Sequence, residues 1–162
     1  MYTYKYPHPA VTADCVVFAH EGAEVYLLLV ERKHDPCKGQ WAFPGGFMNI
    51  DETADDAARR ELMEETGLVV GEVHQVGAYT QVDRDPRERV ITIAYYAEID
   101  GRQTVSGSDD AARAQWFSVS QLPELAFDHA RILKNAMAKS RLFRKQEEKR
   151  CPVSVRIIAF IK

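Results

Sequence analysis

The sequence has few cysteines, no long apolar run and no large excess of either charge. Its 162 residues include three cysteines, Cys15, Cys37 and Cys151, which form no CxxC motif and no Cys/His zinc spacing. This pattern argues against a disulfide framework or a zinc site. It is typical of free thiols in a reducing compartment.

Membrane and nucleic-acid binding are also poorly supported by the sequence. The longest apolar runs, such as VYLLLV at 25–30, are far too short to span a bilayer. The first residues, MYTYKYPHPAV, lack the apolar core of a signal peptide. A net charge of −3 and a pI near 6.0 argue against broad binding to nucleic acid or membrane surfaces. We therefore expect a cytoplasmic protein. A small anionic substrate is still compatible with the net negative charge, because a bound metal can make the local field positive.

Strand-like segments alternate with two helical segments along the chain. Strands are predicted at 12–19, 24–32, 73–80, 89–99 and 115–119, with a short extended piece at 41–47 and a loop at 107–114. Helices are predicted at 54–66 and 128–140, and the first has Thr53 as its N-cap and Gly67 after its last turn. This order favours an α+β fold, an α/β/α sandwich in which a mixed β-sheet lies between helices.

The domain predicted from these elements covers residues 1–140, and residues 141–162 form a C-terminal extension. Its last ten residues, VSVRIIAFIK, are apolar and β-prone. Such a segment can add an edge strand to its own sheet or to a partner subunit, and the second arrangement would be a homodimer. Both arrangements stay open.

Three glutamates near the end of the first helix lie on one helical face. An α-helix turns about 100° per residue, so around the helix axis Glu64 and Glu65 both lie within about 60° of Glu61. Arg60 precedes Glu64 by four residues, but no basic residue follows any of the three at i+4. A solvated charged face is one interpretation; the other is a site for a hard divalent cation such as Mg²⁺ or Mn²⁺, which points to phosphate chemistry.

The spacing around these glutamates resembles the Nudix box, GX5EX7REUXEEXGU, where U is aliphatic. Every fixed position is satisfied, by Gly46, Glu52, Arg60-Glu61-Leu62, Glu64-Glu65 and Gly67-Leu68. The resemblance implies a mixed sheet between helices. It also implies hydrolysis of the pyrophosphate bond in a nucleoside diphosphate linked to another moiety, with Mg²⁺ or Mn²⁺ as the cofactor.

The same resemblance implies a role for each box residue. Glu61, Glu64 and Glu65 would be metal ligands, joined by the carbonyl of Gly46, and one of them can double as the general base. Arg60 would orient the glutamates, and Glu52 would brace Arg60 or touch an outer metal. In some family members the base lies in a loop outside the box. Asp109 and Asp110 are candidates for that role, and a solvated turn is the alternative.

A second segment, VDRDPRERVITIAYYAEI, resembles the ADP-ribose pyrophosphatase-like subgroup and the ligand domain of related regulators of NAD metabolism. The resemblance places Asp83, Arg84, Asp85 and Arg87 near the substrate, with Asp110 as a further substrate-binding candidate. A surface loop with local ion pairs is the alternative.

The function predicted on these grounds is hydrolysis of ADP-ribose to AMP and ribose 5-phosphate. The alternatives are hydrolysis of nucleoside triphosphates and a nucleotide sensor without catalysis. Related regulators carry a winged DNA-binding domain after the Nudix domain, and about 22 residues after Ser140 are too few for one. We therefore expect a nucleotide substrate and no nucleic-acid or membrane partner.

Overall fold

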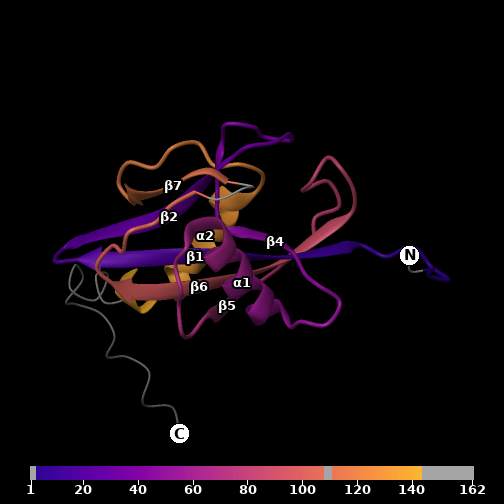
Figure 1. Cartoon of the computed structure of the whole chain (residues 1–162), viewed down its shortest axis with the longest axis horizontal. Helices are drawn as coiled ribbons and strands as arrows, with labels where there is room; N and C mark the ends of the chain where they lie inside the picture. The colour runs from indigo at the N-terminus through magenta and orange to yellow at the C-terminus, as the bar shows by residue number, and fades with distance from the viewer. Residues whose placement is uncertain (1–2, 108–110, 144–162) are drawn as a thin grey trace, which may run out of the picture.

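Seven strands and two helices make up the part of the chain that the structure describes (Figure 1). The structure is a computed structural model, and it describes residues 3–107 and 111–143. The elements are β1 (Ala10–Glu21), β2 (Glu24–Arg32), β3 (Trp41–Ala42), β4 (Gly45–Phe47), α1 (Ala54–Thr66), β5 (His74–Tyr79), β6 (Val90–Asp100), β7 (Ala111–Ser118) and α2 (His129–Lys139). No helix within these residues is long and apolar enough to cross a bilayer.

The strands form one mixed sheet in the order β3-β2-β1-β6-β5, with β4 paired to β1 and β7 paired to β2. The pair β1–β6 is parallel, and the other pairs are antiparallel. Along one edge of β1, residues 12–14 pair with β4 and residues 18–21 pair with β2. Because two strands share this edge, they separate from each other beside the middle of β1.

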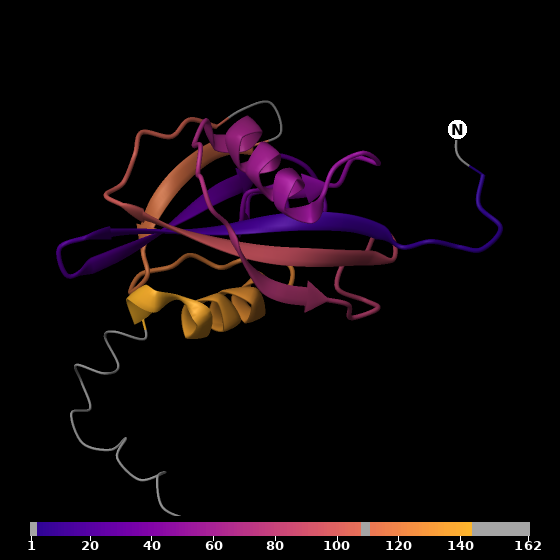
Figure 2. The ribbon, with the colours of Figure 1, turned by 90° about the horizontal axis from the view of Figure 1, so that it is seen from below.

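A helix covers each face of the sheet, as Figure 2 shows, with α1 on one side and α2 on the other. The alternation of β1 explains why both can dock, since successive side chains point to opposite faces. Cys15 and Val17 belong to the buried cluster that contains Leu62 of α1. Val16 and Phe18 belong to the cluster that contains Ile132 of α2. The predicted α+β sandwich is confirmed.

Helix α1 begins and ends at the residues that the sequence predicts. The hydroxyl of Thr53 accepts a hydrogen bond from the Asp56 N–H at 3.4 Å, which satisfies one unpaired donor of the first turn. Gly67 has a φ of 73°, a left-handed conformation that glycine adopts without steric cost, and it ends the helix. Leu62 of α1 packs in one buried cluster with Val17 of β1, and this packing sets the rotational position of the glutamates relative to the sheet.

Several predicted boundaries differ from the structure by a few residues, among them those of β1, β7 and α2. Residues 111–114 were predicted to lie in a loop, but they belong to β7 because Ala114 pairs with Val30, just as Trp116 pairs with Leu28. The second helix ends at Lys139, because Ser140 is extended and its hydroxyl donates to Glu98 at 2.6 Å. The predicted strand at 153–162 lies outside the described residues and stays a prediction.

Candidate active site

Arg60 binds three carboxylates, one in the loop before α1 and two on the helix. Its Nε and Nη2 donate to the two carboxylate oxygens of Glu52, at 3.0 and 2.6 Å. Its Nη1 donates to Glu61 at 2.7 Å and to Glu64 at 2.9 Å. Nη2 also reaches the carbonyl of Phe47 at 3.1 Å. The guanidinium therefore fixes two helix carboxylates relative to the loop that precedes α1.

Glu52 is held from a second side by the backbone N–H of Asn49, at 2.6 Å. The hydrogen bond from Arg60 is the largest cause, and the one from Asn49 the next, of a pKa of Glu52 lowered to about 2. The hydrogen bond with Glu52 is also the largest cause of a raised pKa for Arg60. The pair is therefore fully ionised at neutral pH.

The two glycines of β4 permit two close approaches, of α1 to Gly46 and of β1 to Gly45. A Cβ on Gly46 would lie 2.6 Å from the carboxylate carbon of Glu61, and a Cβ on Gly45 would lie 2.5 Å from the carbonyl oxygen of Ala13. The N–H of Gly45 donates to Glu65 at 3.0 Å. Burial is the largest influence on Glu61 and raises its pKa, although Arg60 opposes the shift. Glu61 and Glu65 thus face β4, whereas the side chain of Glu64 is 54% exposed.

The residue types here fit a hard divalent cation. Three carboxylates and the backbone of Gly46 offer the oxygen ligands that Mg²⁺ and Mn²⁺ prefer, and the missing side chain of Gly46 leaves room beside Glu61. Among the described residues, no three acidic, histidine or cysteine side chains are grouped closely enough to hold an ion as they stand. In this arrangement Nη1 of Arg60 binds two of the carboxylates, those of Glu61 and Glu64.

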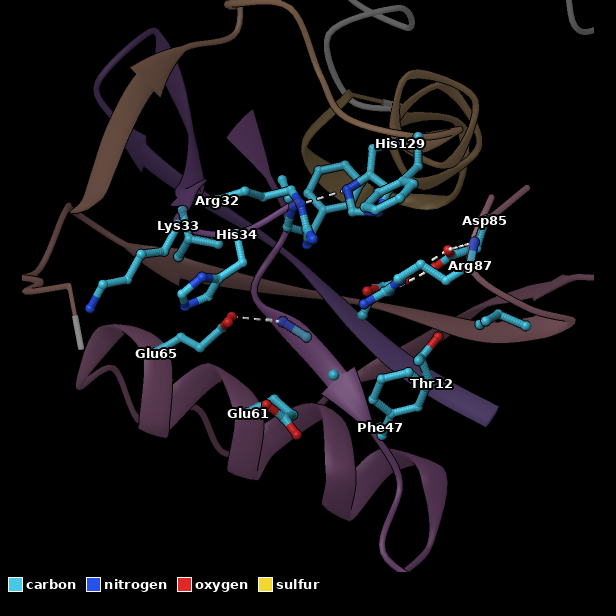
Figure 3. A pocket seen from close by; sticks show the side chains of 18 of the residues that line it. Thr12, Arg32, Lys33, His34, Phe47, Glu61, Glu65, Asp85, Arg87 and His129 are labelled. Carbon is cyan, nitrogen blue, oxygen red and sulfur yellow. Dashed lines mark hydrogen bonds and ion pairs between the residues drawn. The ribbon is translucent and has the colours of Figure 1, made fainter. Parts of the chain in front are cut away.

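A cavity of about 370 Å³ lies between α1, the diverging strands and the β5–β6 loop. Its volume is within the range of small-molecule sites. Glu61 and Glu65 lie along one side, and Arg32 and Arg87 lie across from them (Figure 3). Asp85 and Arg84 also line the cavity, whereas Asp83 is exposed and lies outside its lining. Asp109 and Asp110 are outside the described residues.

Two arginines of the β5–β6 loop, Arg84 and Arg87, are each fixed by an aspartate. Arg84 contacts Asp128 through Nη2 at 2.7 Å and Nε at 3.3 Å, and the side chains are only 4% and 13% exposed. Arg87 contacts Asp85 through Nη2 at 2.7 Å and Nε at 3.0 Å. This contact is the largest cause of a lowered pKa for Asp85. Arg84 and Arg87 therefore form local ion pairs and also line the cavity, so the two interpretations of this loop are compatible.

Three consecutive residues at the start of α2 contact three separate parts of the cavity, and the sequence did not identify them. The ring of Phe127 lies 4.8 Å from the guanidinium of Arg32. Asp128 binds Arg84. Nδ1 of His129 accepts the N–H of Phe43 at 3.0 Å, so the imidazole carries its proton on Nε2. Burial lowers the pKa of His129, which keeps it neutral.

The glutamate face of α1 and the fold match one known family. The Nudix domain model matches residues 8–136. The chain belongs to the Nudix family. The Nudix domain, together with a 42% identical ADP-ribose pyrophosphatase among its relatives, supports a Nudix pyrophosphohydrolase.

Two curated Nudix relatives link the chain to ADP-ribose by name. An ADP-ribose pyrophosphatase from Methanocaldococcus jannaschii is 42% identical over 132 residues, which cover 82% of this chain and 75% of that protein. The ADPR responsive transcriptional repressor NtrR from Acinetobacter baylyi is 32% identical over 154 residues, 93% of this chain. The match spans only 61% of that repressor.

Solved structures give the same picture of the Nudix fold. The NUDIX domain of Shewanella oneidensis NrtR, solved in complex with ADP ribose, has a TM-score of 0.76 and 28% identity, over 83% of this chain and 90% of that one. A MutT/nudix family protein from Enterococcus faecalis has a TM-score of 0.78 and 30% identity, over 86% of this chain and 64% of that one.

Proposed function

We propose that this Nudix hydrolase cleaves the pyrophosphate bond of ADP-ribose, giving AMP and ribose 5-phosphate, and that it depends on Mg²⁺ or Mn²⁺. The observation that carries the proposal is a cavity with carboxylates of α1 on one side and fixed arginines on the other. A diphosphate needs both, since a cation bridges it to carboxylates while guanidinium groups bind its remaining oxygens. The relative named as an ADP-ribose pyrophosphatase supports the choice of substrate.

The metal would be held by Glu61, Glu64 and Glu65, with the carbonyl of Gly46 as a further ligand. When bound, such an ion polarises a phosphoryl oxygen and lowers the pKa of a coordinated water. Arg60 and Glu52 orient the carboxylates through the contacts described above.

The protein's own groups account for the binding and the proton transfer. Arg84 and Arg87 would bind phosphate oxygens through the guanidinium edges that Asp128 and Asp85 leave unused. One carboxylate of α1 would accept the proton of the attacking water. The new P–O bond forms to one phosphorus, and the bridging oxygen leaves with the other phosphate.

A panel assay tests this function. ADP-ribose, NADH, nucleoside triphosphates and nucleotide sugars are each incubated with Mg²⁺ or Mn²⁺, and released phosphomonoester is measured by phosphatase coupling. We expect turnover of ADP-ribose by the wild type and its loss in Glu64→Gln and Glu65→Gln. Preferred turnover of a nucleoside triphosphate would keep the mechanism but reject ADP-ribose as the substrate.

A second candidate is a nucleotide sensor without catalysis, which the resemblance to an ADP-ribose-responsive repressor favours. Tight ADP-ribose binding with no turnover in the presence of metal would support it. The cytoplasmic location, the homodimer and the absence of a nucleic-acid partner stay predictions. The same holds for the domain boundary at residue 140.

A further inference from the structure

Arg32, the last residue of β2, is a half-buried cation without an acidic partner among the described residues. The only hydrogen bond of its guanidinium there runs from Nε to the carbonyl of Pro36, at 2.8 Å. Arginines elsewhere in the protein, such as Arg113 and Arg102, each bind a glutamate. A half-buried charge loses part of its hydration, and a single neutral acceptor does not replace it. Arg32 therefore has unused capacity for an anion.

Arg87 places a second positive charge near Arg32, and the more distant carboxylates of Asp85 and Glu65 offset part of that repulsion. Burial is the main cause of its lowered pKa, and the positive charge of Arg87 is the next. Both residues line the same cavity and lie on the same side of it, across from Glu61 and Glu65 (Figure 3). Two like charges that share a partly desolvated cavity repel each other unless an anion lies between them.

Both guanidinium groups are nevertheless held in place. Arg32 stacks on the ring of Phe127 at 4.8 Å and is tied to Pro36. Phe127 itself has a φ of 52°, an uncommon conformation for a residue other than glycine, which the fold maintains at this position. Arg87 is held by both oxygens of Asp85. Among the described residues, Nη1 and Nη2 of Arg32 and Nη1 of Arg87 make no hydrogen bond.

We propose that Arg32 and Arg87 form a clamp for the diphosphate group of the substrate, on the side of the cavity opposite α1. The clamp rests on the proposed function for its substrate, and it adds Arg32 as a binding residue that the family motif does not include. A diphosphate offers several oxyanions on two linked phosphates, so both arginines can bind at once. Because their side chains are already ordered, less conformational entropy is lost on binding.

The clamp can be tested without metal and without turnover. Inorganic pyrophosphate is titrated calorimetrically, in EDTA, into the wild type, Arg32→Gln and Arg102→Gln. Arg102 is the matched control, because it binds Glu21 and does not line the cavity. Loss of charge-assisted hydrogen bonds should weaken pyrophosphate binding about 10- to 100-fold in Arg32→Gln. Arg102→Gln should bind as the wild type does.

Two outcomes would overturn the clamp: wild type that does not bind pyrophosphate, or Arg32→Gln that binds it equally well. If Arg32→Gln lowers the thermal midpoint strongly, Arg32→Lys decides the matter. It keeps the charge but loses the planar fork, so weakened binding supports the clamp and unchanged binding contradicts it.

The kinetic effect of the clamp is separable from the proposed function. With ADP-ribose and Mg²⁺, we expect Arg32→Gln to raise KM at least tenfold and Arg102→Gln to leave it unchanged. Pyrophosphate binding that depends on Arg32, combined with no hydrolysis of any nucleotide, would reject the proposed function and keep the clamp. Hydrolysis of ADP-ribose with a KM that Arg32→Gln does not change would reject the clamp alone.

Discussion

Arg84 and Asp128 form a two-point ion pair that is almost completely buried, although they lie 44 positions apart in the sequence. The pair joins the β5–β6 loop to the start of α2. Each charge depends on the other, because a buried ion without its partner is strongly destabilising. The pair also determines which edge of Arg84 is available to a ligand.

Removing one member of this pair should unfold the protein more easily. We expect Asp128→Ala to lower the free energy of unfolding by about 3–5 kcal/mol, measured by urea denaturation. The double variant Arg84→Met/Asp128→Leu should recover most of that loss, because an apolar pair replaces two charges. Its KM for ADP-ribose should nevertheless be higher than that of the wild type, because the guanidinium of Arg84 is missing. A single variant as stable as the wild type would contradict the account of the pair.

Replacing Gly46 with alanine should mainly lower activity, whereas replacing Gly45 should mainly lower stability. In Gly46→Ala the new methyl group meets the flexible end of Glu61, so the carboxylate moves, and activity falls while the thermal midpoint changes little. In Gly45→Ala the methyl group meets the backbone of Ala13 and Asp14. We expect a loss of about 1–3 kcal/mol there. If both variants lost the same free energy of unfolding, the side chain of Glu61 would not be moving aside for the methyl group, and the prediction would be wrong.

Glu52 should act on catalysis through Arg60. Glu52→Gln removes one charge from the contact that holds Arg60, and we expect activity to fall about 10- to 100-fold with the fold intact. Glu21→Gln breaks a comparable pair with Arg102 away from the cavity and should leave activity unchanged. A positioning role also predicts weaker metal binding in Glu52→Gln, followed by Mn²⁺ titration. Wild-type Mn²⁺ affinity in this variant would reject that role.

His129 should make stability depend on pH between about 7.5 and 5.5. Its pKa is lowered by burial in the folded protein, so below the ordinary value of 6.5 the unfolded chain binds a proton that the folded chain resists. Stability therefore falls as the pH decreases through 6.5. Asparagine at this position can still accept the Phe43 N–H but does not titrate. The difference in unfolding free energy between wild type and His129→Asn should change across this range, and a constant difference would contradict the assignment.

Local signals were enough to predict α1 and its carboxylates. Thr53 and Gly67 determine the helix ends, and the helical repeat alone places Glu61 and Glu65 on one face. The pairing of Arg60 with Glu64 also follows from their spacing. These features depend on contacts within a few residues, which a sequence shows directly.

The other side of the cavity could not be predicted in the same way. Arg32, Arg84 and Asp128 come from three separate segments, and only the topology of the sheet brings them together. The alanine-rich start of β7 was missed for a similar reason, because pairing with β2 outweighs its weak strand propensity. The sequence does show an arginine, Arg32, at the end of a strand and an aspartate, Asp128, before a helix. Neither position indicates which residue it will contact.

The central claim is that the cavity hydrolyses ADP-ribose with the help of the α1 carboxylates. The most direct measurement is chromatographic analysis of ADP-ribose after incubation with Mg²⁺ and either wild type or Glu61→Gln. The account predicts equal amounts of AMP and ribose 5-phosphate with the wild type, none without metal, and a rate at least about 100-fold lower with the variant. Intact ADP-ribose recovered from wild type that binds both nucleotide and metal would contradict it.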